Sequence, residues 1–587
     1  MRDLKRLLRY LGPYRRDMAL GALLIVAETG FELFIPLLMA SLIDEGAANR
    51  DMGFILQKGV QMGVCALLSL GTGLLYARFA AKAAYGWGAQ VRQAQYERVQ
   101  QFSFANLDHF ETSSLVTRMT TDVTVLQNAV NGGFRPLVRG PVMLVMGVAL
   151  SFWMNPALAL VFLVCAPLLG VVLFFIVRKI APMYGPLQKA VDRLNSVVQE
   201  GLAAIRAVKA FVRDEYEEEK FRQVNESLME TSQNTFRFAV LNLPAFQVVM
   251  YTAVVLIMWF GGGMILHSTL QVGDLTGFLS YVFQVMNSMM MISNVFLLLT
   301  RSLASARRIG QVLDEQVVLT SPENPVEEVP DGSVEFRGVS FKYDSGAREY
   351  ALSQVNLRIP AGQTVGVLGG TGSAKTTLVQ LIPRLYDATQ GTVLVGGRDV
   401  RQYSLRSLRD AVGIVLQKNV LFSGTVRENL QWGGRGAGDG ELWAACRAAC
   451  ASEFLEKLPK GLDTDLGQGG VNLSGGQKQR LCIARALLKK PRVLILDDST
   501  SAVDTATEAQ IRSALARLEG VTKIIIAQRI SSVMGADQII VLDDGRVHAA
   551  GTHQELLASD PIYQEIYASQ KRGGASYGGA AAQCEKA

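Results

Sequence analysis

The sequence predicts an all-α membrane domain of six transmembrane helices with long cytoplasmic extensions, followed by an α/β domain that contains a P-loop. Three observations lead to this prediction. Only 19% of the 587 residues are charged, whereas soluble proteins average about 25%. Apolar runs of membrane-spanning length are confined to the first half of the chain, and a glycine-rich phosphate-binding motif follows a β-rich run in the second half.

Six apolar runs are long enough, at roughly 20 residues, to cross a hydrocarbon core as helices. They lie at 18–43, 54–80, 136–154, 158–177, 245–266 and 275–299. Basic residues are frequent at the N-terminus and after the second and fourth runs, and almost absent from the short links at 45–51, 155–156 and 267–272. The positive-inside rule therefore predicts a multi-pass protein with both ends in the cytoplasm. We expect its location to be a bacterial plasma membrane, with the lipid bilayer as a partner.

The chain is expected to divide into four parts. Helical periodicity with few breakers at 91–104 and 187–212 predicts long helices that project from the membrane. An acidic, proline-containing segment at 321–330 then separates this half from alternating β-rich and helical runs, which indicate an α/β domain. The predicted parts are a transmembrane domain (1–310), a linker (311–332), a nucleotide-binding domain (333–570) and a disordered tail (571–587).

The charge balance and the cysteines exclude other classes of protein. The net charge is only +6, and basic residues at the N-terminus could account for it, so nucleic-acid binding is not indicated. The six cysteines are scattered without a CxxC pair, and none falls in a segment predicted to lie outside the cell. We expect them to be reduced and structural.

A glycine-rich run after the β-rich run 364–368 fits the P-loop pattern GxxxxGK[ST] at every position but one. Its candidate nucleotide contacts are Gly369, Gly370, Thr371, Gly372, Ser373, Ala374, Lys375, Thr376 and Thr377. In such a loop, backbone N–H groups hold the phosphates, the lysine reaches the terminal phosphates and the following hydroxyl binds Mg²⁺. Ala374 stands where the pattern has its last glycine. Taken alone, the run could also be a plain glycine-rich turn.

Two further motifs argue against a plain glycine-rich turn. An apolar run ends in Asp497, which suits a carboxylate beside the metal. Upstream lie Leu473, Ser474, Gly475, Gly476 and Gln477. With the P-loop, this LSGGQ sequence resembles the ATP-binding-cassette (ABC) family, and six spans fused to one cassette resemble a half-transporter of the multidrug exporter type. The resemblance implies that two chains dimerise, each P-loop facing the other chain's LSGGQ across a sandwiched ATP.

The resemblance also suggests roles for single residues. Tyr343 looks like the aromatic residue that stacks on adenine, Gln417 like the residue that links Mg²⁺ to the membrane half, and Asp504 like the acid of the D-loop. The implied cofactors are ATP and Mg²⁺, with Thr376, Gln417 and Asp497 at the metal and Ser474, Gly475, Gly476 and Gln477 at the partner's nucleotide. Segments 108–122 and 200–209 resemble the coupling segments of the family.

Three residues depart from the family pattern. Asp498 stands in place of the glutamate that polarises the attacking water, and a displacement of about 1 Å can cost on the order of 10²-fold in rate. Gln528 stands in place of the switch histidine and cannot become cationic. Ala374 adds a methyl group where backbone must approach phosphate.

These departures favour a heterodimer over a homodimer. A homodimer would carry Asp498 and Gln528 in both sites and would retain little hydrolysis, unless the substitutions are neutral. In a heterodimer, this chain builds a degenerate site that holds ATP, and its LSGGQ completes the hydrolytic site of a second half-transporter.

Two acids in the first apolar run are candidate substrate residues. Glu28 and Glu32 are four residues apart and therefore share one helix face. Carboxylates inside a membrane are costly and usually face a cavity or a partner. They either line the translocation path, with a preference for cationic amphiphiles, or form interhelical hydrogen bonds near Pro36.

The predicted function is an ATP-driven translocase that exports small amphipathic or hydrophobic compounds, such as drugs, lipids or peptides. A lipid floppase and a non-pumping subunit that gates a channel or regulates a partner are the alternatives.

Overall fold

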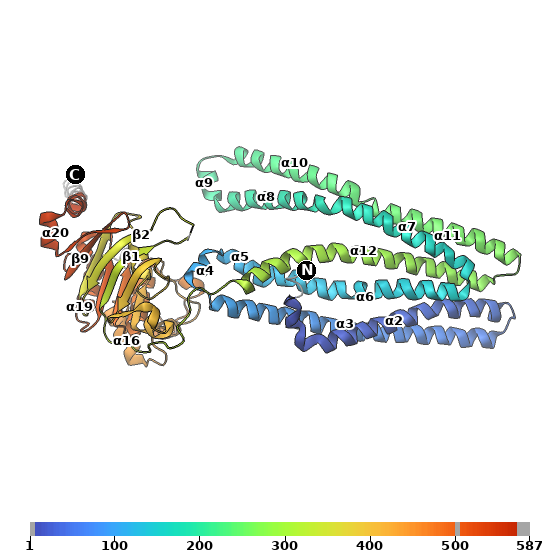
Figure 1. The fold of residues 1–587 in the computed structure, drawn as a ribbon, viewed down its shortest axis with the longest axis horizontal. Helices are drawn as coiled ribbons and strands as arrows, with labels where there is room; N and C mark the ends of the chain where they lie inside the picture. Colours follow the sequence, from blue (N-terminus) through green and yellow to red (C-terminus); the bar gives the residue numbers. More distant parts are fainter. Residues whose placement is uncertain (1–5, 345, 499–504, 572–587) are drawn as a thin grey trace. The chain divides into compact units, whose positions relative to one another are not determined.

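The computed structural model contains a helical unit and an α/β unit (Figure 1). The helical unit comprises Met1–Gln100 and Glu111–Glu315, and the α/β unit comprises Gln101–Phe110 and Gln316–Ala587. The structure describes residues 6–344, 346–498 and 505–571. Asp504 and the predicted tail from residue 572 onward thus lie outside the described residues.

The predicted spans are helices, which confirms the all-helical membrane domain. The long helices of this unit are α2 (Arg15–Ser41), α3 (Met52–Gln100), α6 (Val123–Met154), α7 (Pro156–Ile180), α8 (Tyr184–Ala203), α10 (Asp214–Ala239), α11 (Asn242–Leu266) and α12 (Val272–Asp314). Short helical segments join them: η1 (Leu8–Tyr14), η2 (Leu42–Ala47), α5 (Thr112–Thr117), η3 (Arg118–Asp122), η4 (Ala181–Met183) and α9 (Ile205–Ala210). Six stretches of the described helices are long and apolar enough to cross a membrane.

The membrane helices bury one face against each other and expose apolar side chains on the other. α2 lies beside α3, α6 beside α12 and α7 beside α11. Phe162 of α7 stacks on Phe278 of α12 with ring centroids 6.3 Å apart, in a core of buried apolar side chains. On α7, large apolar residues such as Leu163 and Phe175 are exposed. This distribution is typical of helices whose outer face contacts lipid.

The two predicted cytoplasmic helices are shorter than expected. The first ends at Gln100, because Ser103 caps a new short helix, α4 (Phe104–Asp108), by accepting from the Asn106 backbone N–H. The second breaks at Ala204, whose φ and ψ are −94° and 8°. Short helix α9 then joins the ends of the neighbouring helices α8 and α10 (Figure 1). A continuous helix over 187–212 would leave no residues for this reversal.

Two sheets build the α/β unit. A six-stranded sheet has the order β10-β9-β3-β8-β7-β6, and a four-stranded antiparallel sheet has the order β2-β1-β4-β5. The strands are β1 (Val334–Phe341), β2 (Leu352–Ile359), β3 (Thr364–Gly369), β4 (Gln390–Val395), β5 (Arg398–Asp399), β6 (Val412–Val415), β7 (Val493–Asp497), β8 (Thr522–Ile526), β9 (Gln538–Asp543) and β10 (Arg546–Gly551). The helices are α4, α13 (Lys375–Gln380), α14 (Leu405–Ala411), α15 (Val426–Gln431), α16 (Asp439–Ala448), α17 (Ser452–Leu455), α18 (Gly475–Leu488), α19 (Thr505–Ala516) and α20 (His553–Ser559).

The inner strands β3, β7, β8 and β9 of the six-stranded sheet are buried on both faces, which explains why they are nearly continuous apolar runs. In β7, Val493 and Ile495 belong to one hydrophobic core, whereas Leu494 and Leu496 belong to the other. Parallel pairing of β3 with β8 and of β8 with β7 brings the carboxyl ends of these strands together. Ligands of open α/β sheets bind outside such ends.

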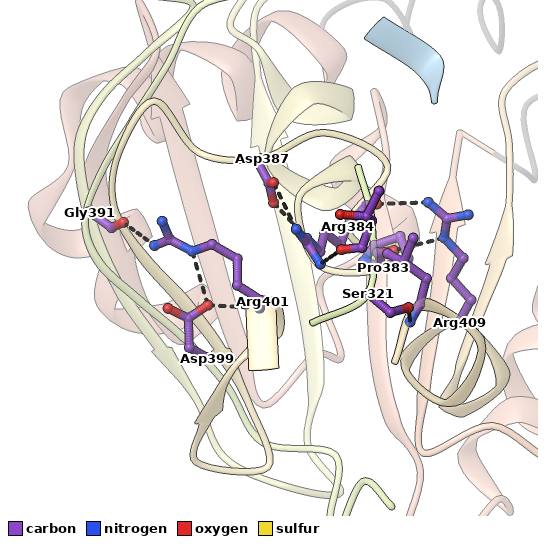
Figure 2. A network of polar contacts seen from close by, with 10 residues as sticks. Ser321, Pro383, Arg384, Asp387, Gly391, Asp399, Arg401 and Arg409 are labelled. Atoms are coloured by element: carbon purple, nitrogen blue, oxygen red, sulfur yellow. Dashed lines mark hydrogen bonds and ion pairs between the residues drawn. The ribbon is translucent and has the colours of Figure 1, made fainter. Parts of the chain in front are cut away.

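Within the α/β unit, a polar network fastens the segment before β1 to residues that lie between α13 and β6 (Figure 2). The buried Arg384 donates to both oxygens of Asp387, at 2.7 and 3.0 Å, and to the carbonyl of Thr320 at 3.1 Å. The Leu405 backbone N–H donates to Ser321 Oγ at 3.1 Å, and Arg409 donates to the Arg384 carbonyl at 2.9 Å. The segment is thus tied to the residues that follow the P-loop helix α13.

Candidate nucleotide site

Most of the nucleotide-binding residues predicted outside the LSGGQ line one cavity of about 560 Å³ at the carboxyl ends of β3 and β7. Its lining includes Tyr343, Gly369, Gly370, Thr371, Gly372, Ala374, Lys375, Thr376, Thr377, Gln417, Asp497, Asp498 and Gln528. Ser373 is buried beneath the loop and donates to the Gly370 carbonyl at 2.9 Å. Residues from five separate segments of the sequence are therefore brought together.

The P-loop backbone requires glycine at the first position of the pattern. Gly369 has a φ of +154°, and a Cβ there would lie 2.2 Å from the Leu542 carbonyl oxygen. Lys375 Nζ donates to the carbonyls of Gly369 and Gly370 at 2.9 and 2.7 Å. Burial lowers the pKa of Lys375, although the nearby Asp497 and Asp498 oppose this effect.

Ala374 adopts a left-handed conformation, with φ +67° and ψ 28°. This is the conformation for which the pattern has glycine, and it costs a residue with a Cβ roughly 1–2 kcal/mol. The departure at this position therefore strains the backbone, besides adding a methyl group to the cavity lining.

Replacing Ala374 by glycine is expected to stabilise the protein. The relief of strain exceeds the entropy cost of glycine, so we expect a gain of about 1 kcal/mol and a rise of roughly 2–4 °C in the melting temperature. Calorimetry on the full chain would measure it. Ala411→Gly, at the end of helix α14 and outside the left-handed region, is the matched control and should lower the melting temperature. An unchanged or lower value for Ala374→Gly would contradict the strain.

Thr376 and Asp497 form a pair suited to Mg²⁺. Thr376 Oγ1 donates to Asp497 Oδ1 at 3.1 Å, while the buried Asp497 Oδ2 has no hydrogen-bond partner among the described residues. Burial raises the pKa of Asp497, and the Thr376 bond opposes this. An acceptor left free beside a threonine hydroxyl fits a hard cation, which prefers oxygen ligands. When bound, Mg²⁺ supplies charge neutralisation on the phosphates.

Asp498 and Gln528 are in direct contact. Gln528 Nε2 donates to Asp498 Oδ2 at 3.0 Å, and Asp498 has a left-handed φ of +46°. Burial raises the pKa of Asp498, whereas Lys375, Arg529 and the Gln528 bond lower it. The amide donates to the carboxylate but cannot supply the positive charge that an imidazolium would bring.

Tyr343 is placed at the mouth of the cavity and belongs to a chain of contacts. Its ring is half exposed, and its OH lies 2.8 Å from Thr377 Oγ1. Tyr386 packs edge-on against it, with centroids 5.3 Å apart, and donates to Asp108 Oδ2 at 2.8 Å. Burial and Asp108 raise the pKa of Tyr386, so the phenol keeps its proton. Tyr386 is absent from the predicted site, and no local motif marks it.

The LSGGQ residues lie away from this cavity. Ser474 caps α18 by accepting from the Gln477 backbone N–H at 3.4 Å, while the Gln477 side chain accepts from the Ser474 N–H at 2.8 Å. Ser474 and Gly475 are exposed, and Gly476 and Gln477 are half buried. None of the four lines the cavity formed by the P-loop.

The two family models that match the sequence divide it as the fold does. Residues 18–289 match the ABC transporter transmembrane region, and residues 352–501 match the ABC transporter domain. The chain belongs to the ABC transporters. Six spans fused to one ATPase domain make it an ABC exporter half-transporter, an integral membrane protein whose ATPase domain implies ATP-driven transport.

Relatives align over almost the whole chain. The ABC transporter ATP-binding protein YfiB of Bacillus subtilis is 37% identical over 97% of this chain and 98% of its own length. The ATP-dependent lipid A-core flippase of Desulfotalea psychrophila is 31% identical over 97% and 99%. A bacterial Atm1-family ABC exporter, solved with ATP bound, covers 95% of this chain and 98% of its own with a TM-score of 0.79. At 24% identity, the last comparison supports the fold.

The candidate substrate residues are paired with arginines. Glu28 and Glu32 of α2 each form an ion pair with α6, Glu28 with Arg135 and Glu32 with Arg139. Neither arginine was predicted, although they share the four-residue spacing of the two acids.

Proposed function

We propose that this chain is one subunit of a heterodimeric ABC exporter, in which its own P-loop binds ATP and Mg²⁺ at a degenerate site. Its LSGGQ, at Ser474, Gly475, Gly476 and Gln477, serves the P-loop of the partner, where hydrolysis takes place. The exported compounds are amphipathic or hydrophobic.

The contact between Gln528 and Asp498 carries this proposal. The shorter carboxylate is bonded to a neutral amide at 3.0 Å, so neither group supplies the base and the imidazolium that fast cleavage of the γ-phosphate requires. Lys375, Thr376 and Asp497 retain the arrangement for holding phosphate and Mg²⁺. Binding is therefore expected to survive while hydrolysis is slowed.

The position of LSGGQ supports a second chain as partner. An exposed serine and glycine at the start of α18 lie outside the chain's own nucleotide cavity. The Ser474 backbone N–H is already bonded to the Gln477 side chain, whereas the Ser474 hydroxyl only accepts from the Gln477 N–H and keeps its own hydrogen to donate to the nucleotide of another subunit. Both chain ends are proposed to lie in the cytoplasm of a bacterium, with the membrane half in its plasma membrane.

A lipid floppase is the second candidate, because one relative is a lipid A-core flippase. A non-pumping subunit that gates a channel or regulates a partner remains the alternative in another class, and substrate-stimulated ATPase with uphill transport by the reconstituted complex would separate it from a pump.

The heterodimer is tested by purifying this chain alone and together with the product of the adjacent reading frame, which is expected to carry the glutamate and histidine that this chain lacks. We expect the chain alone to hydrolyse ATP about 10²-fold more slowly than the complex. A Lys375→Met variant of the lone chain sets the background. ATPase from the lone chain as fast as from the complex would overturn the proposal.

A further inference from the structure

Four charged side chains meet within the membrane-spanning part of the helical unit. Glu28 and Glu32 of α2 and Arg135 and Arg139 of α6 form what we call the arginine–glutamate cluster. Arg135 pairs with Glu28 and Arg139 with Glu32, and Arg139 Nη1 also lies 3.5 Å from Glu28 Oε1. The four formal charges cancel, so paired carboxylates give no reason to expect a preference for cations.

The cluster is completed by two polar residues of α3. Ser69 Oγ donates to Glu32 Oε1 at 3.5 Å, and the Arg135 guanidinium lies over the Tyr76 ring, 5.8 Å from its centroid. Gly73 allows α2 and α3 to approach, because a Cβ there would lie 3.3 Å from Glu28 Oε1. Three helices thus contribute to one polar site in an otherwise apolar region.

Helix geometry places the cluster toward the cytoplasmic side of the membrane. At a rise of 1.5 Å per residue, Glu28 lies roughly 20 Å from the end of α2 at Ser41, and Arg135 lies roughly 29 Å from the end of α6 at Met154. In the predicted orientation both of these ends are outside the cell. Since the hydrocarbon core is about 30 Å thick, the cluster lies in its inner half, at the depth a compound entering from the cytoplasmic leaflet would reach.

In the ion pair between Arg135 and Glu28, the arginine is exposed and the glutamate is buried. The Arg135 side chain is 42% exposed, whereas that of Glu28 is 3% exposed. A guanidinium inside a membrane is not stable against lipid and faces a cavity that contains water or a partner. The group that this cluster offers to such a cavity is therefore a cationic hydrogen-bond donor.

Hydrogen bonding within the cluster is incomplete. In the part of the chain that the structure describes, Glu28 Oε2, Tyr76 OH, Arg135 Nε and Arg139 Nε are buried without a hydrogen-bond partner. Buried polar atoms are paired in the great majority of cases, so four unpaired atoms in one place require an explanation. Three of them are potential donors, and a bound anion with several oxygens would give donors partners.

We propose that the arginine–glutamate cluster recognises a phosphate or carboxylate group of the transported compound, with Arg135 as the principal contact. This deepens the proposed export function and rests on it. A guanidinium suits such a group because its planar donors match two oxygens at once. Glu28 competes with the anion for Arg135, so release of the anion lets the ion pair close again.

The test measures binding of an anionic probe in the absence of nucleotide. Its result therefore does not depend on whether the two ATP sites differ. The full chain with its partner is placed in nanodiscs of zwitterionic lipid and titrated with a fluorescent short-chain phosphatidic acid. We expect Arg135→Gln to weaken binding about tenfold, since one charge-assisted bidentate contact is lost. Arg135→Lys should keep part of the affinity, and Glu28→Gln should raise it severalfold by freeing the guanidinium.

Matched controls separate recognition from folding. Lys82→Gln removes another exposed base, which pairs with Asp17 at 3.1 Å, and should leave probe binding unchanged. The double variant Glu28→Gln/Arg135→Gln removes both charges of the pair without leaving a buried carboxylate, and should bind as weakly as Arg135→Gln. A diacylglycerol probe of the same chain length should bind all variants equally.

Glycerol 3-phosphate distinguishes the source of the anion. If it competes as strongly as phosphatidic acid, the site takes soluble phosphates, and if it competes weakly, the site takes lipid headgroups; both results support anion recognition when they depend on Arg135. Unchanged probe binding in Arg135→Gln would overturn the proposal, as would a failure of Glu28→Gln to increase it. Weaker assembly of Arg135→Gln with unchanged probe binding would show that Arg135 pairs with the partner chain instead.

Discussion

Replacing Ser474 by alanine is expected to lower the steady-state ATPase of the heterodimer by roughly 10²-fold, whereas Asp498→Asn should change it by less than about twofold. In the proposed heterodimer the serine donates toward a γ-phosphate bound by the other chain, and loss of one such donor costs about 10²–10³ in turnover. Asp498 lines the chain's own nucleotide cavity, the site that is proposed to contribute little turnover. Steady-state phosphate release from the purified complex measures both variants.

Ser474 also caps α18, so the control must remove a cap elsewhere. Thr552 forms the same type of capping box with Glu555 at the start of α20, and it does not line the nucleotide cavity. Thr552→Ala should cost about 1 kcal/mol of stability with turnover intact. Equal losses of turnover in Ser474→Ala and Asp498→Asn would refute the assignment of hydrolysis to the partner's site.

The sequence predicts those elements of the fold that are formed by one uninterrupted apolar run. The buried parallel strands are apolar runs, so β3, β7, β8 and β9 begin and end within one residue of the β-rich runs predicted from the sequence at 364–368, 492–496, 523–527 and 538–542. The four-stranded antiparallel sheet was not predicted, because its exposed positions interrupt the apolar pattern. The break at Ser103 had a local signal, a serine followed three residues later by Asn106, which completes a capping box. The break at Ala204 has no such signal.

In the candidate site, too, residues that belong to short motifs could be predicted, whereas contacts between distant residues could not. Its motifs are short and their spacing is fixed by loop geometry, so most of the residues that line the cavity could be named from the sequence. Tyr386 and the pairing of Glu28 with Arg135 depend on contacts between residues about a hundred or more positions apart. A single sequence contains no record of such contacts. The left-handed conformation of Ala374 could be predicted in part. The motif specifies glycine at this position, and glycine is the residue that adopts such a conformation readily.

The double variant Asp498→Glu/Gln528→His is expected to convert the ATP-retaining site into a hydrolytic one. In the wild type, Lys375, Thr376 and Asp497 are arranged to hold phosphate and Mg²⁺, while the amide of Gln528 donates to the short carboxylate of Asp498. ATP should therefore persist at this P-loop through several cycles of the partner site. Restoring the base and the imidazole should shorten that residence and raise the ATPase of the lone chain by on the order of 10²-fold.

Nucleotide trapped during steady turnover reports on each site separately. Photo-crosslinked nucleotide recovered on the peptide that contains Lys375 should be mainly ATP in the wild-type complex, and ADP should rise to the level of the partner's site in the double variant. Gln528→His alone is the matched control, because it supplies the imidazole without lengthening the carboxylate, and it should leave ATP predominant. ADP recovered as often at this P-loop as at the partner's in the wild type would rule out retention. Retained ATP would keep the two ATPase domains associated while the partner site cycles, and that association limits how far the inward-facing state can open.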